Sequence, residues 1–484
     1  MGVPRSTIVA AVRAAAARVP ERAAVVGSDQ RLTYGELEGR SAAAAAHIAK
    51  HARGDIVGLL LPNTPAFIWA LLGALGAGKT VAVLPAPAPP PLLKMMAAEA
   101  RLETVLTSTE LAPRLAETKV NALLIEHFPS ATNREVALGN HAPAAVLLYT
   151  SGTTGRPKAV ALSDQNILSN ADGCRQAAGF GAEEVMLALL PLFHAYGLTV
   201  TLLLPLTLGG TVVLQERFAP RTVLQAIERH RVTSLVAVPS QYRLLAKEPT
   251  QADTASLWLC IAGAERLSER VAHDFQARFD IPILQGYGAT EAGPVISMNP
   301  PGANRPASVG RPLPNLRVTL REDGRELPAG QTGEIGVEGP NLMLGYHNQP
   351  QATAEKLVNG VLRTGDCGFL DADGYLHLAG RADDLIKVAG EKIYPAEVEH
   401  ALEQIEGVEE AAVIGVPDEK HGSVLHAFVQ PRPGAALTDV GLRAACREHL
   451  ETIKIPRSFV LLEQLPRTAG GKLDKRALAA QVIK

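Results

Sequence analysis

Helix-like apolar patterns alternate with short runs rich in β-branched residues along most of this chain. VTSLVAVP (residues 232–239) and LWLCIAG (residues 257–263) are typical short runs, and RSAAAAAHIAK (residues 40–50) is typical of an amphipathic helix. This alternation predicts an α/β fold with largely parallel sheets. The chain has 484 residues, which exceeds one ordinary core, so two or more domains are expected.

The character of the sequence changes after about residue 310. Residues 316–346 alternate short strand-like runs with turn signals, which predicts a small β-barrel or antiparallel sheet. The last hundred residues are typical of a compact α+β unit. We therefore expect a large N-terminal domain of stacked α/β sheets plus a small β-barrel (residues 1–380), a boundary at residues 381–384, and a small α+β C-terminal domain (residues 385–484).

Charge and cysteine content disfavour several classes of function. Lysine and arginine together number 47 against 49 acidic residues, so no basic excess indicates binding to nucleic acid or to an anionic membrane. Four isolated cysteines form no zinc-binding spacing, and a disulfide framework is not expected at this size. These features favour a reducing, cytoplasmic location.

The longest uncharged run, residues 187–215, is long enough to span a membrane. Pro191, Pro205, the pair Gly209–Gly210 and His194 interrupt it, so we predict buried helix and strand within an α/β core and no stable membrane insertion. The N-terminal stretch has arginines among its apolar residues, which makes it a poor secretory signal.

The stretch GALGAGKT (residues 73–80) fits the P-loop pattern G-x-x-x-x-G-K-[ST] of many ATPases and GTPases. A P-loop requires a strand before the glycines and a helix after them. Here a predicted helix, capped at Asn63 or Thr64, precedes the glycines and a strand follows. We interpret the stretch as a helix–strand turn, with Gly78 at the helix C-cap and Lys79 complementing the helix dipole.

A second glycine-rich stretch, YTSGTTGRPK (residues 149–158), is the better candidate for a phosphate site. It follows a predicted strand at residues 145–149, and a helix begins after KAVAL at Ser163. Its glycines let backbone amides turn inward, its hydroxyl residues add donors, and Lys158 adds a full charge. The alternative is an ordinary Ser/Thr/Gly surface loop.

This stretch and four others occur in the order typical of the adenylate-forming superfamily of acyl-CoA synthetases, luciferases and peptide-synthetase adenylation domains. The others are PLFHAYGL (191–198), GYGATEAG (286–293), RTGDCGFLDADGYLHLAGRADDLIK (363–387) and PRTAGGKLDKRAL (466–478). The chain resembles this superfamily over nearly its whole length. The residues within these motifs are most similar to those of fatty-acyl-CoA and acyl–acyl-carrier-protein synthetases.

The resemblance implies an ATP site. The implied ATP- and AMP-binding residues are Thr150, Ser151, Gly152, Thr153, Thr154, Gly155, Lys158, Gly263, Ala264, Glu265, Tyr287, Gly288, Thr290, Asp366 and Arg381. The glycine loop would hold the β- and γ-phosphates and Thr290 the α-phosphate. Tyr287 would stack on adenine opposite the backbone of residues 263–265, and Asp366, as an exposed residue in a turn, would accept the ribose hydroxyls.

The resemblance also implies a metal site, in which Glu291, with Thr150, would hold Mg²⁺. Each of these residues also has an ordinary structural explanation. Glu291 could be a carboxylate at a helix N-terminus, Tyr287 a core aromatic residue and Asp366 a simple turn residue.

Lys158, His194 and Lys472 are the implied catalytic residues. Lys472 would stabilise the transition state of adenylation, although an isolated lysine is usually a solvated surface charge. Asp383 matches the hinge about which the family's small domain moves between two reactions. Gly390 would allow the thiol arm of the acceptor close to the backbone.

The implied reaction joins a carboxylic acid to a thiol at the expense of ATP, releasing AMP and pyrophosphate. His194 lies where amino-acid-activating members carry Asp, which disfavours an amino-acid substrate, although an isolated histidine is more often a satisfied core residue. A medium- or long-chain fatty acid is the first expectation and an aryl or short-chain acid the second. CoA and the phosphopantetheine of a carrier protein remain alternative acceptors.

Two rival functions follow from the sequence, a P-loop NTPase that uses residues 73–80 and a non-catalytic binding module. The presence of Lys158, Lys472 and Glu291 disfavours the second. Ala159 and Gly470 stand where the family usually has Gly and Ser. Both substitutions are small and should spare the backbone geometry.

Overall fold

The structure is a computed structural model, and it describes residues 7–28, 30–130, 143–150, 157–418, 420–467 and 473–482. The chain divides into two compact units. The first comprises residues 1–318, 336–363 and 374–376, and the second comprises residues 319–335, 364–373 and 377–484. The domain boundary and hinge expected at residues 381–384 stay predictions.

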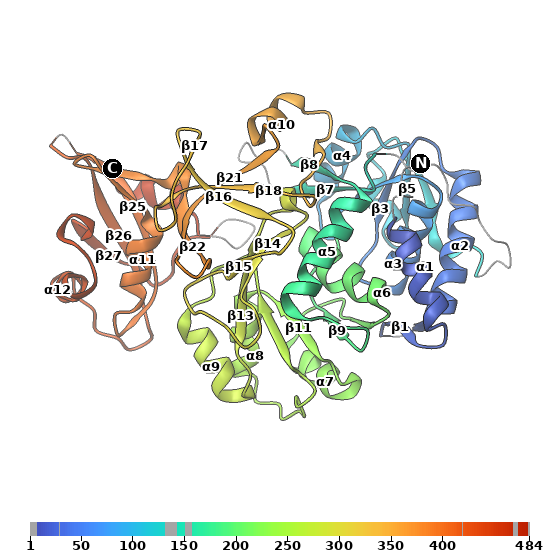
Figure 1. The fold of residues 1–484 in the computed structure, drawn as a ribbon, viewed down its shortest axis with the longest axis horizontal. Coiled ribbons are helices and arrows are strands. Elements are labelled where there is room, and N and C mark those ends of the chain that lie inside the picture. Colours follow the sequence, from blue (N-terminus) through green and yellow to red (C-terminus); the bar gives the residue numbers. More distant parts are fainter. Residues whose placement is uncertain are drawn as a thin grey trace. The chain divides into compact units, whose positions relative to one another are not determined.

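The first unit contains two large sheets (Figure 1). In spatial order, the nine-stranded sheet contains β15 (Arg311–Pro312), β14 (Val295–Met298), β13 (Ile283–Gly288), β12 (Leu259–Ala262), β11 (Ser234–Ala237), β9 (Val185–Ala188), β10 (Thr211–Leu214), β1 (Ala23–Val26) and β2 (Arg31–Thr33). Six consecutive members, from β13 to β1, pair in parallel. The α/β fold with parallel sheets is therefore confirmed.

The seven-stranded sheet contains β19 (Gly345–Tyr346), β8 (Lys158–Leu162), β7 (Val146–Thr150), β4 (Thr80–Val83), β3 (Ile56–Leu60), β5 (Thr104–Thr107) and β6 (Asn121–Leu124). Its strands from β7 to β6 pair in parallel, whereas β8 and β19 are antiparallel additions at one edge. Strands β4 and β5 are fully buried, as expected for parallel strands covered on both faces.

Helices surround these strands, and the uncharged run at residues 187–215 lies inside the unit. The helices of this unit are α1 (Ile8–Arg18), α2 (Tyr34–His51), α3 (Pro65–Gly76), α4 (Pro90–Glu99), α5 (Asp164–Ala178), α6 (Leu204–Leu208), α7 (Pro220–His230), α8 (Pro239–Lys247), α9 (Glu269–Phe279) and α10 (Pro350–Lys356). A π-helical segment, Gly197–Leu203, precedes α6, and all seven of its residues are buried. Among the described residues, no helix is both long and apolar enough to cross a bilayer.

The P-loop-like stretch is a helix–strand turn, as predicted. Helix α3 precedes it and β4 follows it. Gly73 packs against α2, where an added Cβ would lie 2.5 Å from the Ala44 Cβ, and Gly78 adopts a positive φ of 77° after the helix end. The Lys79 ammonium donates to the Gly54 carbonyl over 2.7 Å. Helix packing and helix termination therefore explain these glycines.

Thr64 is the N-cap residue of α3, as predicted, although its side chain makes no cap hydrogen bond. The predicted C-cap is wrong by one residue, because Ala77 is the C-cap and Gly78 follows it. Asn63 contacts the backbone at the start of the PLFHAYGL segment, at Leu190 and Leu192. Its side-chain amide donates to the Leu190 carbonyl, and its Oδ1 accepts from the Leu192 N–H. Each of these hydrogen bonds is 3.0 Å long.

A six-stranded sheet follows in the sequence, as the change of character near residue 310 predicts. Its members are β17 (Arg325–Glu326), β16 (Arg317–Glu322), β18 (Gly333–Glu338), β21 (Val361–Leu370), β20 (Leu357–Val358) and β22 (Leu376–Arg381), the last paired with β21. Strands β21 and β22 form the hairpin expected around Asp373 and Gly374, with Gly374 at a φ of 79°.

The C-terminal part of the second unit is α+β, as predicted. Its elements are β23 (Ile386–Val388), β24 (Glu391–Ile393), α11 (Pro395–Glu403), β25 (Val408–Asp418), β26 (Gly422–Pro431), α12 (Asp439–His449), β27 (Ser458–Leu461) and α13 (Lys475–Val482). A buried cluster that includes Val398, Val413 and Leu442 forms its core.

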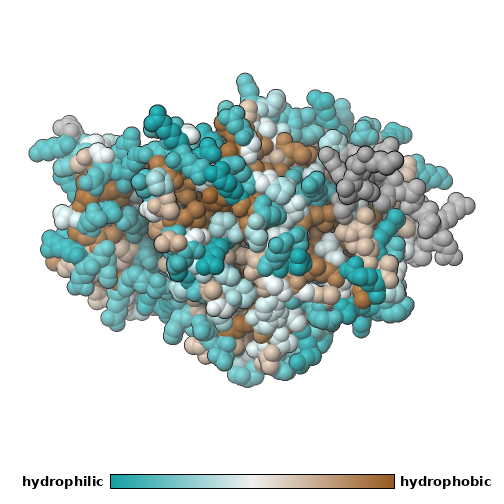
Figure 2. Space-filling view, in the orientation of Figure 1, coloured by the Kyte–Doolittle hydropathy of each residue, from teal (hydrophilic) through white to brown (hydrophobic). Residues whose placement is uncertain are grey.

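On the face of the molecule in Figure 2, hydrophilic residues predominate and hydrophobic ones gather in separate patches.

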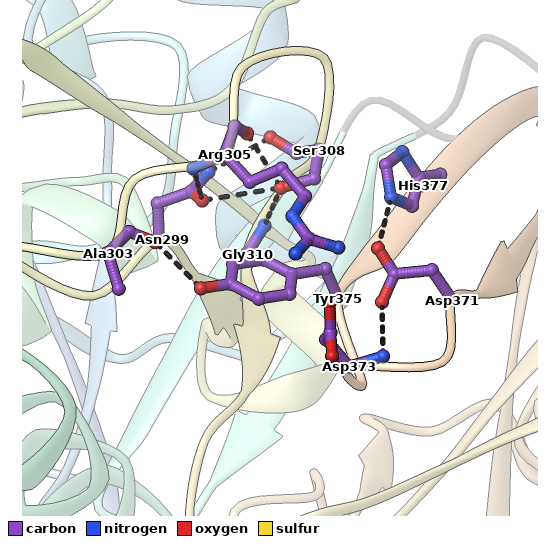
Figure 3. A network of polar contacts seen from close by, with 9 residues as sticks. All are labelled: Asn299, Ala303, Arg305, Ser308, Gly310, Asp371, Asp373, Tyr375 and His377. Atoms are coloured by element: carbon purple, nitrogen blue, oxygen red, sulfur yellow. Dashed lines mark hydrogen bonds and ion pairs between the residues drawn. The ribbon is translucent and has the colours of Figure 1, made fainter.

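A polar network fixes the segment after β14 in the first unit (Figure 3). The Tyr375 hydroxyl donates to the Ala303 carbonyl over 2.7 Å, and the Arg305 guanidinium lies 4.3 Å from the centre of the Tyr375 ring. Asn299 is fully enclosed, donates to the Ser308 carbonyl and accepts from the Arg305 N–H. These contacts hold the chain that follows the GYGATEAG motif.

Candidate active site

The second glycine-rich stretch lies at the tip of a β-hairpin. Strands β7 and β8, which form the phosphate hairpin, pair antiparallel, with Thr150 opposite Lys158 at the end joined by the glycine-rich loop. The element after the loop is therefore a strand, and helix α5 begins only after the Ser163 cap. Ser151, Gly152, Thr153, Thr154 and Gly155 lie outside the described residues.

Lys158 and Glu291 both contact Tyr346. The Lys158 Nζ lies 4.9 Å from the centre of the Tyr346 ring. The Tyr346 hydroxyl donates to Glu291 Oε1 over 2.8 Å. Glu291 lies in a short 3₁₀ turn, Thr290–Ala292, directly after β13. The structure thus brings together the phosphate-loop lysine and the predicted metal ligand.

Tyr346 is a residue that the sequence analysis missed. It is 6% exposed. Burial, and then the Glu291 carboxylate, raise the pKa of Tyr346, so its hydroxyl keeps its proton and remains a donor. The only sequence signal is an aromatic residue with a polar tip at the end of a strand-like run, which is also typical of an ordinary core tyrosine.

The predicted adenine-binding segments lie on neighbouring strands β12 and β13. Gly263 follows β12 directly, and an added Cβ there would lie 2.7 Å from the Tyr196 ring. Ala264 has a φ of 68°, a left-handed conformation that costs a non-glycine residue about 1 kcal/mol or more. Ala264 and Glu265 are exposed, while Tyr287 on β13 is half-buried rather than enclosed in the core.

Gly288 ends β13 where the chain approaches its neighbouring strand closely. A Cβ at this position would lie 2.2 Å from the Pro294 carbonyl oxygen. Only glycine fits this approach, and it sets the path of the backbone into the turn that carries Thr290 and Glu291.

Asp366 and Arg381 meet in the second unit. The Arg381 guanidinium donates to Asp366 Oδ1 over 2.9 Å. The expectation of an exposed Asp in a turn is wrong, because Asp366 lies within the continuous strand β21 and its side chain is 20% exposed. Gly365, with a φ of 78°, provides the local bend that the TGD sequence predicts.

His194 begins the helical segment that leads into the buried π-helix. Its N–H donates to the Pro191 carbonyl, and its carbonyl accepts from Leu198. The side chain is open to solvent, so the alternative of a satisfied core histidine is wrong. Partial desolvation lowers the pKa of His194 below 6.5, which favours the neutral imidazole.

Lys472 lies outside the described residues, but its flanks are held firmly. Arg467 and Leu473 form an antiparallel bridge on either side of the loop. After the loop, the Lys475 ammonium lies 2.7 Å from Glu399 Oε1. Glu399 is 9% exposed and also accepts from the Val413 N–H.

The residues predicted for the hinge and for the thiol acceptor fall on turns of the second unit. Asp383 is exposed in a 3₁₀ turn, Ala382–Asp384, between β22 and β23. Gly390 and Ala389 connect β23 to β24 with positive φ values of 91° and 49°. Among the residues that the structure describes, no atom would lie within 4 Å of a Cβ at Gly390.

Comparison with known protein families agrees with this arrangement. The family described as "AMP-binding enzyme" matches residues 12–347, and "AMP-binding enzyme C-terminal domain" matches residues 397–472. The chain belongs to the AMP-binding enzyme family. This family is the adenylate-forming superfamily that the sequence motifs indicate, so the resemblance is confirmed.

Relatives and solved structures of the AMP-binding family cover nearly the whole chain. A long-chain-fatty-acid–CoA ligase of Bacillus subtilis is 32% identical over 98% of this chain and 94% of its own. A feruloyl-CoA synthase of an Amycolatopsis species is 35% identical over 94% and 95%. The ATP-bound MatB of Rhodopseudomonas palustris matches with a TM-score of 0.88, 27% identity and coverage of 98% and 99%.

This AMP-binding enzyme is an acid–thiol ligase. It activates a carboxylic acid with ATP through an acyl-adenylate and joins the acyl group to a thiol.

Proposed function

We propose that the protein activates a medium- or long-chain fatty acid and transfers the acyl group to CoA. The observation that carries the activation chemistry is the contact of Tyr346 with both Lys158 and Glu291, because it gathers a cation and a carboxylate beside the glycine-rich loop. The fatty-acid assignment is supported by the fully buried, uncharged segment that follows His194 and by the similarity to a fatty-acid ligase.

In the first step, a carboxylate oxygen of the acid attacks the α-phosphorus of ATP, and the bond to pyrophosphate breaks. Lys158 and the loop of residues 150–158 hold the β- and γ-phosphates, and Thr290 contacts the α-phosphate. Lys472 reaches the reacting groups and stabilises the charge that develops there. In the second step, the thiol attacks the acyl carbonyl and AMP leaves.

Two groups of residues bind the nucleoside in this proposal. Tyr287 stacks on adenine, with the backbone of residues 263–265 on the other side. Asp366 accepts the ribose hydroxyls while Arg381 fixes its carboxylate. Asp383 serves as the hinge, and Gly390 admits the thiol arm of the acceptor.

Glu291 fits a magnesium ion bound chiefly by the nucleotide. Mg²⁺ in phosphoryl-transfer sites is commonly held by one or two carboxylates together with substrate phosphates. Among the described residues no cluster of three or more His, Cys, Asp or Glu side chains could hold a cation. Bound there, Mg²⁺ would neutralise charge on the phosphates, and Glu291, with Thr150, would supply its protein ligands.

An aryl or short-chain acid is the second candidate, favoured by the similarity to a feruloyl-CoA synthase. An acyl carrier protein is the alternative acceptor, since its phosphopantetheine presents the same thiol arm as CoA.

Isotope exchange between ATP and pyrophosphate tests the proposal with a panel of fatty, aryl and short-chain acids. The strongest exchange should occur with a medium- or long-chain fatty acid. Strongest exchange with ferulate or a short-chain acid would overturn the substrate assignment. Thioester formation with CoA and with a holo carrier protein, measured side by side, then identifies the acceptor.

A further inference from the structure

The backbone around Tyr346 is an edge strand of the phosphate hairpin. Strand β19 pairs antiparallel with β8, so that Tyr346 lies opposite Val160. On either side of the strand, the Leu344 N–H donates to the Ala161 carbonyl over 2.9 Å and the His347 N–H donates to the Ala159 carbonyl over 2.8 Å. Tyr346 is therefore fixed to the strand that begins with Lys158.

The same segment is bonded to Glu291 at two points. The Met343 N–H donates to the Glu291 backbone carbonyl over 2.9 Å. Three residues later, the Tyr346 hydroxyl donates to the Glu291 side chain. Both the backbone and the side chain of Glu291 are thus hydrogen-bonded to residues 343–346, and these bonds reduce the rotamer freedom of the carboxylate.

We propose that Tyr346 is a positioning residue that sets the distance between Lys158 and Glu291. Its ring face supports the lysine ammonium, and its hydroxyl orients one carboxylate oxygen, which leaves the other oxygen for a metal–nucleotide complex. This inference rests on the proposed roles of Lys158 and Glu291 in binding ATP and its cation, and it is independent of which acid is the substrate.

The two contacts act through different parts of the side chain, so they can be separated by mutation. A hydrogen bond to a charged group typically contributes enough free energy to change an affinity by about tenfold or more. A cation–π contact is weaker at exposed sites and changes an affinity by about two- to tenfold. Tyr346→Phe removes only the hydroxyl, whereas Tyr346→Leu also removes the ring.

Direct binding measurements on the full-length protein test this proposal without any acid. Manganese binding is followed by EPR in the presence of α,β-methylene-ATP, and binding of the nucleotide alone is followed by calorimetry in EDTA. Tyr346→Phe should weaken Mn²⁺ binding about tenfold and leave metal-free nucleotide affinity unchanged. Tyr346→Leu should weaken Mn²⁺ binding and also metal-free nucleotide binding. The expected loss of metal-free nucleotide affinity is about two- to tenfold relative to Tyr346→Phe.

Tyr242→Phe is the matched control for loss of a buried tyrosine hydroxyl. The Tyr242 hydroxyl donates to the Leu235 and Ile261 carbonyls within the core, and its side chain is fully buried. This variant should lower the melting temperature yet bind Mn²⁺ and nucleotide like the wild type.

Wild-type metal and nucleotide affinities in both folded Tyr346 variants would overturn the proposal, as would a wild-type protein that binds no Mn²⁺ with the nucleotide. The binding measurements contain no acid, so they do not depend on the fatty-acid assignment. An error in that assignment would appear separately, in the pyrophosphate exchange with different acids.

Discussion

Arg381 and Asp366 form an ion pair across the β21–β22 hairpin, with 2.9 Å between the guanidinium and Oδ1. The Asp366 backbone N–H also bonds to the Thr364 hydroxyl, which in turn donates to the Ile335 carbonyl. The carboxylate is therefore held on a fixed strand and oriented by the guanidinium beside it.

Removing Asp366 should weaken nucleotide binding more than it weakens the fold. Asp366→Ala loses the acceptor proposed for the ribose hydroxyls, so AMP affinity should fall about tenfold. Arg381→Gln keeps the acceptor but frees its orientation, so its effect should be smaller. A half-exposed ion pair contributes about 1 kcal/mol or less to folding. Calorimetric titration with AMP and urea unfolding check the two effects, and equal AMP affinity in Asp366→Ala would contradict the ribose assignment.

The sequence predicted local structure well because local signals decide it. Helix α3, the Gly78 terminus and strand β4 follow from apolar periodicity and glycine placement within residues 63–84. The Tyr346 contacts could not be predicted from the sequence because they join residues 158, 291 and 346. Nothing within any one of these segments indicates that the three residues lie close together. Asp366 was misplaced because the bend at Gly365 occurs within a strand, whereas glycine in sequence usually signals a turn.

Lys79 serves as a test of the P-loop-like stretch. Its ammonium bonds to the Gly54 carbonyl near the C-terminal end of α3. Lys79→Ala should cost about 1 kcal/mol or less in the free energy of unfolding. Nucleotide affinity and pyrophosphate exchange should be unchanged, as equilibrium binding and exchange assays will show. A large loss of ATP binding would revive the rejected P-loop NTPase interpretation.

The Lys475–Glu399 pair should stabilise the C-terminal part of the chain around Lys472. Lys475→Met removes the cation beside the buried Glu399 carboxylate, which keeps the hydrogen bond from the Val413 N–H, and should lower the free energy of unfolding by about 1–3 kcal/mol. Lys475→Arg should retain most of the stability. Because the pair lies just after the Lys472 loop, acid-dependent exchange should fall more in Lys475→Met than in Lys475→Arg.

The exposed pair Lys94–Glu117 is the matched control for that change, since both of its side chains are more than half exposed. Lys94→Met should change the unfolding free energy by less than about 1 kcal/mol. Urea unfolding of the three variants gives the comparison. An equal loss in Lys94→Met and Lys475→Met would show that burial of Glu399 does not matter.

His194 should make folding stability depend on pH below neutrality. Desolvation holds the pKa of His194 in the folded state below its ordinary value of 6.5, so the unfolded chain takes up this proton first as the pH falls. The neutral ring makes its full contribution to the free energy of unfolding above pH 6.5. This contribution is lost as the pH falls from 6.5 through the folded-state pKa. His194→Gln cannot take up that proton. Urea unfolding at pH 8.0 and pH 5.5 should therefore show wild-type stability decreasing relative to His194→Gln at the lower pH. An identical difference between the two proteins at both pH values would contradict the lowered pKa.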